Sequence, residues 1–213
     1  MPLLTRLAGE LQALHDLQLD LDVDAFLVDD RLRGTLSGAR LHLPEQLFVR
    51  DGGDALEMSL YIDPRVLAQL EQDDPMARLH SGNLANFCIA LEGLSHLLFL
   101  AWRYELGAPV TALELELQAE VDKFVVAWLL LSEQGMDRAR AAAALRWQLF
   151  IAFSLQPWQS PEEADRYRTA SQAAAQYCLG LARRFATDRA PQRILNDVRA
   201  FSRRDLGHKL RGG

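Results

Sequence analysis

Two apolar segments of the sequence carry ionisable side chains that recur at helical spacing. The ionisable residues of the first segment are Glu92, His96 and Arg103, and those of the second are Glu116, Glu120 and Lys123. With about 100° of rotation per residue, each set falls on one face of its helix. Carboxylates and an imidazole on such faces can bind a metal ion or transfer protons. The candidates for a catalytic site of this kind are Glu92, His96, Glu116 and Glu120.

The same two faces have a second interpretation, in which the charges neutralise one another as a salt-bridged seam. Helical di-metal proteins use a Glu-x-x-His motif on each of two helices. Here Glu92 and His96 are four positions apart, and the pair occurs once among the long helical segments. We therefore favour the seam and expect neither a metal nor another cofactor. If a metal is bound, Glu92, His96 and Glu120 are its candidate ligands.

Other motifs in the sequence begin a site but do not complete it. The pattern Asp20-x-Asp22-x-Asp24 starts like a calcium loop. However, Ala25 stands where the loop requires glycine, and Arg31 stands where it requires a bidentate glutamate. The sequence contains no Gly-x-Ser-x-Gly motif, and its two cysteines have no partnered base, so nucleophilic catalysis is not expected.

Composition is that of an ordinary globular protein. The 213 residues are 49% hydrophobic and 24% charged, which is enough for one sizeable core. Apolar runs such as 124–131 and 149–153 are far shorter than the roughly 20 residues of a membrane span. The N-terminus lacks the basic and apolar regions of a signal peptide. We expect a cytoplasmic protein without a membrane partner, and the high content of Ala, Leu and Arg is typical of GC-rich bacterial genomes.

The two cysteines do not form a disulfide framework. Cys88 and Cys178 lie ninety positions apart in apolar, helix-patterned surroundings. Two isolated thiols argue against a secreted disulfide scaffold. We expect both to act as small buried hydrophobic residues.

Formal charge is unevenly distributed along the chain. The whole chain carries −6, whereas from Arg183 onward nine basic residues face three aspartates, a charge of +6. The basic tail contains Arg203, Arg204, Lys209 and Arg211. Such a tail can bind an acidic partner or nucleic acid, or lie on the acidic body of its own chain. Because no aromatic residues are interleaved with these charges, we do not expect nucleic acid as a partner.

The first 80 residues predict an N-terminal unit with a helix and a β-hairpin. Leucines between residues 3 and 17 recur at helical spacing, and residues 19–26 alternate as in an edge strand or a loop that enters a helical turn. Two period-two segments, 46–50 and 55–62, flank Gly52-Gly53, which predicts a hairpin. Asp63 as N-cap and Pro64 at the first helical position then begin a short helix.

Residues 81–213 predict five long helices, at about 83–105, 112–133, 136–155, 160–185 and 191–205. Thr111 with Glu114 predicts a capping box, Gly135 a left-handed helix end, and residues 160–163 a strong helix start. Short connections make sequential helices pack alongside each other. The predicted fold is mainly α: an antiparallel bundle of about five helices, with the N-terminal helix and hairpin packed against it in one compact domain.

A group of aromatic residues late in the chain has two interpretations. The members of the group are Trp147, Phe150, Phe153 and Trp158. We expect them in the core, although they would suit a dimer interface if they were exposed. Without a complete catalytic set, we expect a non-catalytic protein that acts through protein–protein contacts or self-association, for example as a homodimer. The alternative is a helical metal-binding or acid/base enzyme that uses the Glu/His cluster defined above.

Overall fold

The computed structural model describes residues 1–52, 55–152, 160–187 and 191–211. The fold is mainly α with one two-stranded antiparallel sheet, which confirms the predicted class. The chain forms two compact units. Unit 1 contains residues 1–12 and 18–109, and unit 2 contains residues 13–17 and 110–213. The division falls near residue 110, whereas the sequence pattern placed a change at residue 81.

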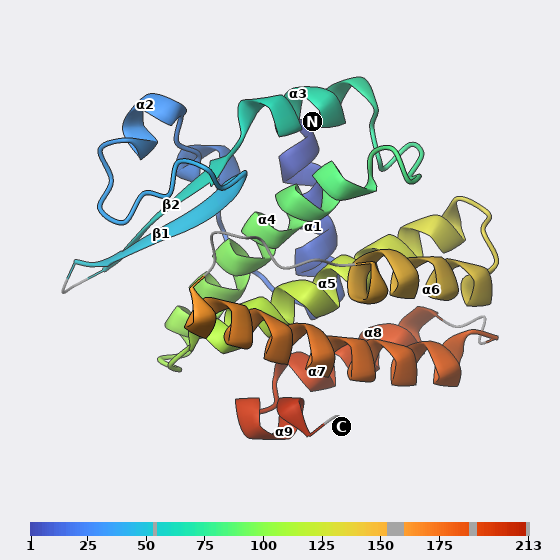
Figure 1. Cartoon of the computed structure of the whole chain (residues 1–213). Helices are drawn as coiled ribbons and strands as arrows, with labels where there is room; N and C mark the ends of the chain where they lie inside the picture. Colours follow the sequence, from blue (N-terminus) through green and yellow to red (C-terminus); the bar gives the residue numbers. More distant parts are fainter. Residues whose placement is uncertain (53–54, 153–159, 188–190, 212–213) are drawn as a thin grey trace. The chain divides into compact units, whose positions relative to one another are not determined.

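Unit 1 combines helices with the sheet (Figure 1). Its elements are α1 (Leu3–His15, whose last turn belongs to unit 2), η1 (Val23–Phe26), α2 (Asp30–Arg33), β1 (Glu45–Asp51), β2 (Leu56–Ile62), α3 (Pro64–Gln72) and α4 (Leu84–Glu105). The predicted hairpin is confirmed, with Glu45 opposite Ile62 and Asp51 opposite Leu56. The alternating stretch at residues 19–26 is a loop that enters the 3₁₀ turn η1, which was one of its two interpretations.

The hairpin packs directly on α4, which explains why α4 belongs to unit 1. A Cβ atom at Gly93 would lie 2.9 Å from Leu60 Cδ1 of β2 and 3.2 Å from Glu45 Oε2 of β1. The first distance is too short for a Cβ atom unless the buried Leu60 side chain shifts, so glycine permits the close approach of helix and sheet. The short helix α3 also packs against α4. Its predicted start is confirmed, because Asp63 accepts a hydrogen bond from the Arg65 amide and Pro64 is the first residue.

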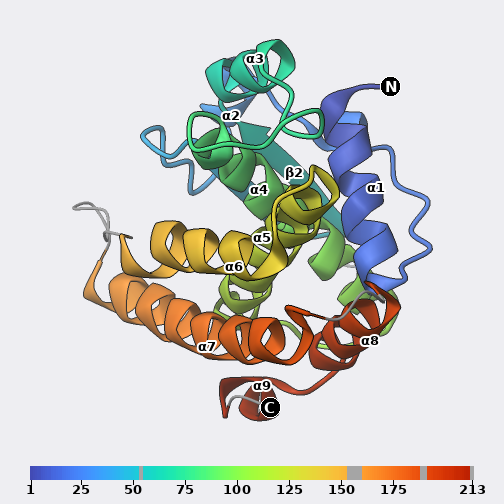
Figure 2. The same ribbon diagram turned by 90° about the vertical axis from the view of Figure 1, so that its right-hand side faces the viewer.

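Unit 2 is helical in its described part. Its elements are α5 (Ala112–Glu133), α6 (Arg138–Arg146), the π-helical turn η2 (Trp147–Ile151), α7 (Pro161–Phe185), α8 (Pro191–Ser202) and α9 (Leu206–Leu210). The long helices α5 and α7 make its main packing contact, and α6 packs against both (Figure 2). The short helix α9 lies in a segment that the sequence pattern assigned to an irregular tail.

Several helix ends of unit 2 follow the sequence signals. The helix start at residues 160–163 is confirmed as a full capping box between Ser160 and Glu163, and Gly135 has a φ of +92°. The helix predicted at 136–155 is α only to Arg146 and continues as the π-helical turn η2. Its predicted last residues, 153–155, lie outside the described residues. The predicted capping box at Thr111 is wrong in one half: Thr111 accepts from the Glu114 amide, but the Glu114 carboxylate bonds Lys209.

Helix α4 is long and apolar enough to cross a membrane by length and composition, with a mean hydropathy of 1.6 over its best window. That window is 67% buried inside the protein. A core helix of a globular protein passes the same test, so the signal is weak. The sequence analysis of apolar runs did not single out this helix.

Candidate functional site

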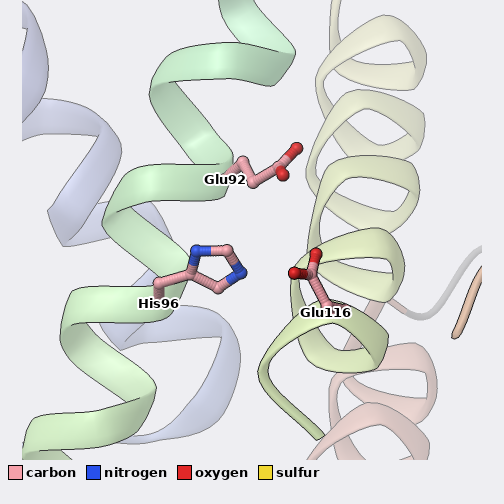
Figure 3. A group of neighbouring side chains, drawn as sticks. All are labelled: Glu92, His96 and Glu116. Carbon is pink, nitrogen blue, oxygen red and sulfur yellow. The ribbon is translucent and has the colours of Figure 1, made fainter. Parts of the chain in front are cut away.

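Glu92 and His96 lie on successive turns of α4, and their side chains leave the same side of the helix (Figure 3). A carboxylate oxygen of Glu92 and a ring nitrogen of His96 lie within 4.8 Å of each other. His96 is 8% exposed, and Glu92 is half-buried. The spacing of four residues therefore brings a carboxylate and an imidazole together on one helix face, as expected. Two such groups can share a proton or supply two ligands to a metal ion.

Glu116 and Glu120 lie on α5, in unit 2. Glu116, also drawn in Figure 3, is half-buried one turn before Glu120. Glu120 is 3% exposed and accepts hydrogen bonds from Lys123 Nζ and from the Tyr167 hydroxyl, both at 2.7 Å. A carboxylate that is held by an ammonium and a phenol is satisfied where it lies. Glu120 is therefore satisfied within unit 2, by Lys123 of its own helix and by Tyr167 of α7.

A second buried polar chain, which the sequence analysis did not find, runs through unit 2. His15 Nε2 lies 2.7 Å from Asp122 Oδ1, and His15 Nδ1 lies 2.8 Å from the Ser202 hydroxyl oxygen. Gln118 donates a further bond of 2.9 Å to the same Asp122 oxygen. These residues are between 1% and 5% exposed. The chain joins the end of α1, the middle of α5 and the end of α8.

The hydrogen-bonded group of Ser202, His15 and Asp122 has the residue types of a hydrolase triad. Its burial is that of a structural network. Ser202 is 1% exposed, and its hydroxyl also lies 2.9 Å from the Val198 carbonyl one turn earlier in α8. The single hydroxyl proton can go to this carbonyl or to His15 Nδ1, according to the tautomer of His15. A nucleophile must also reach its substrate, and a side chain that is 1% exposed has no access to one. We therefore interpret this group of hydrogen-bonded side chains as a structural connection between three helices.

Two arginines, one in α8 and one directly after it, add hydrogen bonds at the end of α1. Arg199 donates from Nε to the Leu14 carbonyl at 3.0 Å and from Nη2 to the Ala13 carbonyl at 2.7 Å. Arg203 donates to the His15 carbonyl at 3.2 Å. The last carbonyls of a helix have no partner within the helix and carry the negative end of its dipole. Two guanidinium groups therefore satisfy both the hydrogen bonds and the charge at this helix end.

The basic tail does not present all of its charges to solvent. Arg203, Arg204 and Arg211 are exposed, whereas Lys209 is fully buried in an ion pair with Glu114. The Lys209 ammonium also lies 5.8 Å from the centre of the Phe201 ring. The tail therefore folds onto its own unit through Lys209, which agrees with the interpretation of a basic helix on an acidic body. Lys209 cannot belong to an exposed nucleic-acid surface.

The two described members of the aromatic group, Trp147 and Phe150, lie in η2 and differ in exposure. Phe150 is half-buried and stacks on the Phe124 ring of α5 at a centroid distance of 5.9 Å. Trp147 is 60% exposed and Ile151 is 48% exposed, so the expectation of a core position is wrong for Trp147. Phe153 and Trp158 lie outside the described residues. Of the four aromatic residues that would suit an interface if they were exposed, Trp147 meets that condition.

Both cysteines are free thiols, as expected. Cys178 is fully buried, and its pKa is raised by burial and then by the charges of Glu120 and Asp122. A thiol of this kind is unreactive. Cys88 is half-buried.

No protein-family model matches the chain, and no curated protein or solved structure is significantly similar to it.

Proposed function

We propose that this protein is non-catalytic and self-associates through an exposed apolar surface of unit 2. The association patch consists of Trp147 and Ile151, at the two ends of the turn η2. The observation that carries the proposal is the exposure of both side chains, 60% and 48%. Tryptophan is enriched among the residues that dominate binding energy at protein interfaces.

The turn that carries the patch is fixed from beneath. Phe150, in the same turn, stacks on Phe124, and Phe124 is fully buried in α5. π-helical turns are rare and are frequently found at functional sites. A patch held in one conformation loses little entropy on binding, which favours association.

Charge favours a second copy of this chain as the partner. Arg140 and Arg146 are exposed residues of α6, and Arg146 directly precedes Trp147 in the chain. Unit 2 contains fifteen basic and thirteen acidic residues, whereas unit 1 contains eight basic and sixteen acidic residues. Their formal charges are therefore +2 and −8. An apolar patch with a basic border fits the acidic unit 1 of another copy, in a head-to-tail contact.

Sedimentation velocity of a variant pair tests the patch. The double variant Trp147→Ser/Ile151→Ser should sediment as a monomer at concentrations at which the wild-type protein associates. The matched control is Leu106→Ser, which removes an apolar side chain that is 62% exposed outside η2. This control should associate like the wild type. Association of the double variant equal to that of the wild type would contradict the proposal.

A second candidate function, metal binding or acid–base chemistry, is favoured by the neighbouring side chains of Glu92 and His96. The participation of Glu116 in such a site stays a prediction. Titration with Zn²⁺ under calorimetry tests the idea: His96→Ala should weaken binding at least tenfold, because it removes a nitrogen ligand. His208→Ala, which removes an exposed imidazole of the tail, is the control. Absence of Zn²⁺ binding to the wild-type protein would remove this candidate.

The cytoplasmic location expected from the sequence stays a prediction. Self-association through the patch does not depend on it. Nucleic acid is not proposed as a partner. The buried ion pair of Lys209 with Glu114 reduces the basic surface on which such binding would depend.

A further inference from the structure

Unit 1 contains a polar cavity of about 310 Å³ that is separate from the Glu92–His96 pair and from the exposed Trp147 and Ile151. It is formed by α2, the loop at residues 41–44, the end of β2 and the start of α3. Its volume is at the lower end of the range of small-molecule sites. Its lining combines charged and polar side chains with the apolar side chains of Leu41, Leu43 and Pro44.

Arg33 is the most unusual residue of the cavity wall. It is 2% exposed, and its Nη2 donates to the carbonyls of Arg40 and Leu43, the latter at 3.0 Å. The guanidinium carbon lies 3.8 Å from the centre of the Tyr61 ring. Its Nε atom is buried and makes no hydrogen bond to any described residue. A buried cation with an unused donor at a cavity wall points to an absent acceptor.

The carboxylates near Arg33 do not supply that acceptor. Asp63 is held by Arg65, whose Nε and Nη2 donate to it at 3.0 Å and 2.5 Å. Asp30 accepts the Tyr61 hydroxyl proton at 2.7 Å. Within the described part of the chain, Arg33 forms no ion pair with either aspartate. A negatively charged group from outside the chain would complete its environment.

Asp30 has the opposite requirement in the same cavity. Its carboxylate has the Tyr61 hydroxyl as a neutral donor, but no cation among the described residues lies within ion-pair distance of it. Asp30 is exposed, so the group is accessible from solvent. Asp30 and Arg33 are three residues apart on α2, and both contact Tyr61. One wall of the cavity thus carries a cation and a carboxylate, each without a counter-ion.

We propose that this cavity binds a small zwitterion, an α-amino acid with an aliphatic side chain. Its carboxylate would accept from the Arg33 guanidinium, and its ammonium group would donate to Asp30. A simple anion would meet the charges of Asp30 and Asp63, and a simple cation would meet that of Arg33, so a ligand with both charges fits best. The aliphatic side chain would contact Leu41, Leu43 and Pro44.

Calorimetry with L-leucine and two analogues tests the charge requirement. 4-Methylpentanoate lacks the ammonium group of leucine, and 3-methylbutylamine lacks its carboxylate. Both should bind at least about tenfold more weakly than L-leucine, because each loses one charge-assisted hydrogen bond. Equal binding of 4-methylpentanoate, or of inorganic phosphate, would show a plain anion site and overturn the proposal. Absence of L-leucine binding at millimolar concentration would also overturn it.

Variants on α2 locate the site. Asp30→Asn keeps the acceptor for Tyr61 but removes the charge, and it should weaken L-leucine binding at least about tenfold. Binding of 4-methylpentanoate should not weaken in this variant. Arg31→Gln, an exposed arginine of the same helix outside the cavity lining, is the matched control and should bind like the wild type. Arg33→Lys keeps the charge without the planar guanidinium and should also weaken L-leucine binding.

Binding of L-leucine should not depend on the proposed self-association. L-leucine should bind the double variant Trp147→Ser/Ile151→Ser as tightly as the wild type. Unchanged L-leucine affinity in folded Asp30→Asn, with folding checked by circular dichroism, would overturn the assignment.

Discussion

The ammonium group of Lys209 lies 2.9 Å from a carboxylate oxygen of Glu114, with Lys209 fully buried and the Glu114 side chain 5% exposed. Lys209 is in α9, near the end of the chain, and Glu114 is in the first turn of α5. The pair therefore attaches the C-terminal helix to the start of the central helix of unit 2. A charge buried in this way is tolerated because its partner is present.

Removing one member of this pair should destabilise unit 2. Lys209→Met leaves the Glu114 carboxylate buried without its counter-ion, and we expect a loss of about 3–5 kcal/mol in the free energy of unfolding. Urea denaturation followed by circular dichroism measures it. Arg211→Met, an exposed charge in the same tail, should change the stability by less than about 0.5 kcal/mol. The double variant Glu114→Gln/Lys209→Met should recover most of the loss, and equal stability of Lys209→Met and Arg211→Met would refute the role of the pair.

The hydrogen bond between His15 and Asp122 should be measurable as a coupling between two variants. His15→Gln and Asp122→Asn each break the buried chain, and in a double-mutant cycle we expect a coupling energy of about 1–3 kcal/mol. Ser202→Ala removes one partner of His15 and should cost about 1 kcal/mol. Additive effects of the two first variants would show that His15 and Asp122 do not interact in solution.

Acid should destabilise the start of α3 through Asp63. Hydrogen bonds from Arg65 hold the pKa of Asp63 below its ordinary value, against the opposing effect of burial. A lowered folded-state pKa stabilises the protein above the unfolded-state pKa of about 3.9, and this contribution is lost as the pH falls through the folded-state value. Between pH 5 and pH 2, the stability of Asp63→Asn should therefore fall less steeply than that of the wild type. Arg65→Gln should flatten the dependence too, and identical slopes in all three proteins would contradict this explanation.

The two thiols should differ in reactivity. Cys178 is fully buried with a raised pKa, whereas Cys88 is half-buried. In a titration with Ellman's reagent at neutral pH, we expect one thiol to react quickly and the second only after denaturation. Cys88→Ala should abolish the fast phase, and Cys178→Ala should leave it intact. A fast phase that survives in Cys88→Ala would show that unit 2 opens readily around Cys178.

The local part of the fold could be predicted from the sequence because its signals are local. The period-two pattern of the hairpin strands, the Asp63-Pro64 start of α3 and the Ser160 capping box are signals that lie within a few residues of one another. The boundary between the two units, near residue 110, could not be predicted in the same way. Residues 81–109 have the periodicity of any bundle helix, and it is the lack of a side chain at Gly93 that lets the hairpin pack on this helix.

The candidate sites were predicted where one helix carries both groups and missed where distant segments meet. The spacing of Glu92 and His96 was enough to place them together. His15 and Ser202 are 187 positions apart, and Lys209 and Glu114 are 95 apart, so no periodicity connects them. Arg33 is the last residue of the short helix α2, and its guanidinium packs on the Tyr61 ring of β2, 28 positions later in the chain. For these residues, the pattern of a single sequence contains no corresponding signal.

The most direct test of the central claim, self-association through the patch at Trp147 and Ile151, is the molar mass of the wild-type protein by light scattering. We expect the mass to rise above 23.9 kDa as the concentration increases through the micromolar range, and to rise less in high salt because the contact joins surfaces of opposite charge. A mass that stays at 23.9 kDa up to about 100 μM, at low and at high salt, would contradict the account.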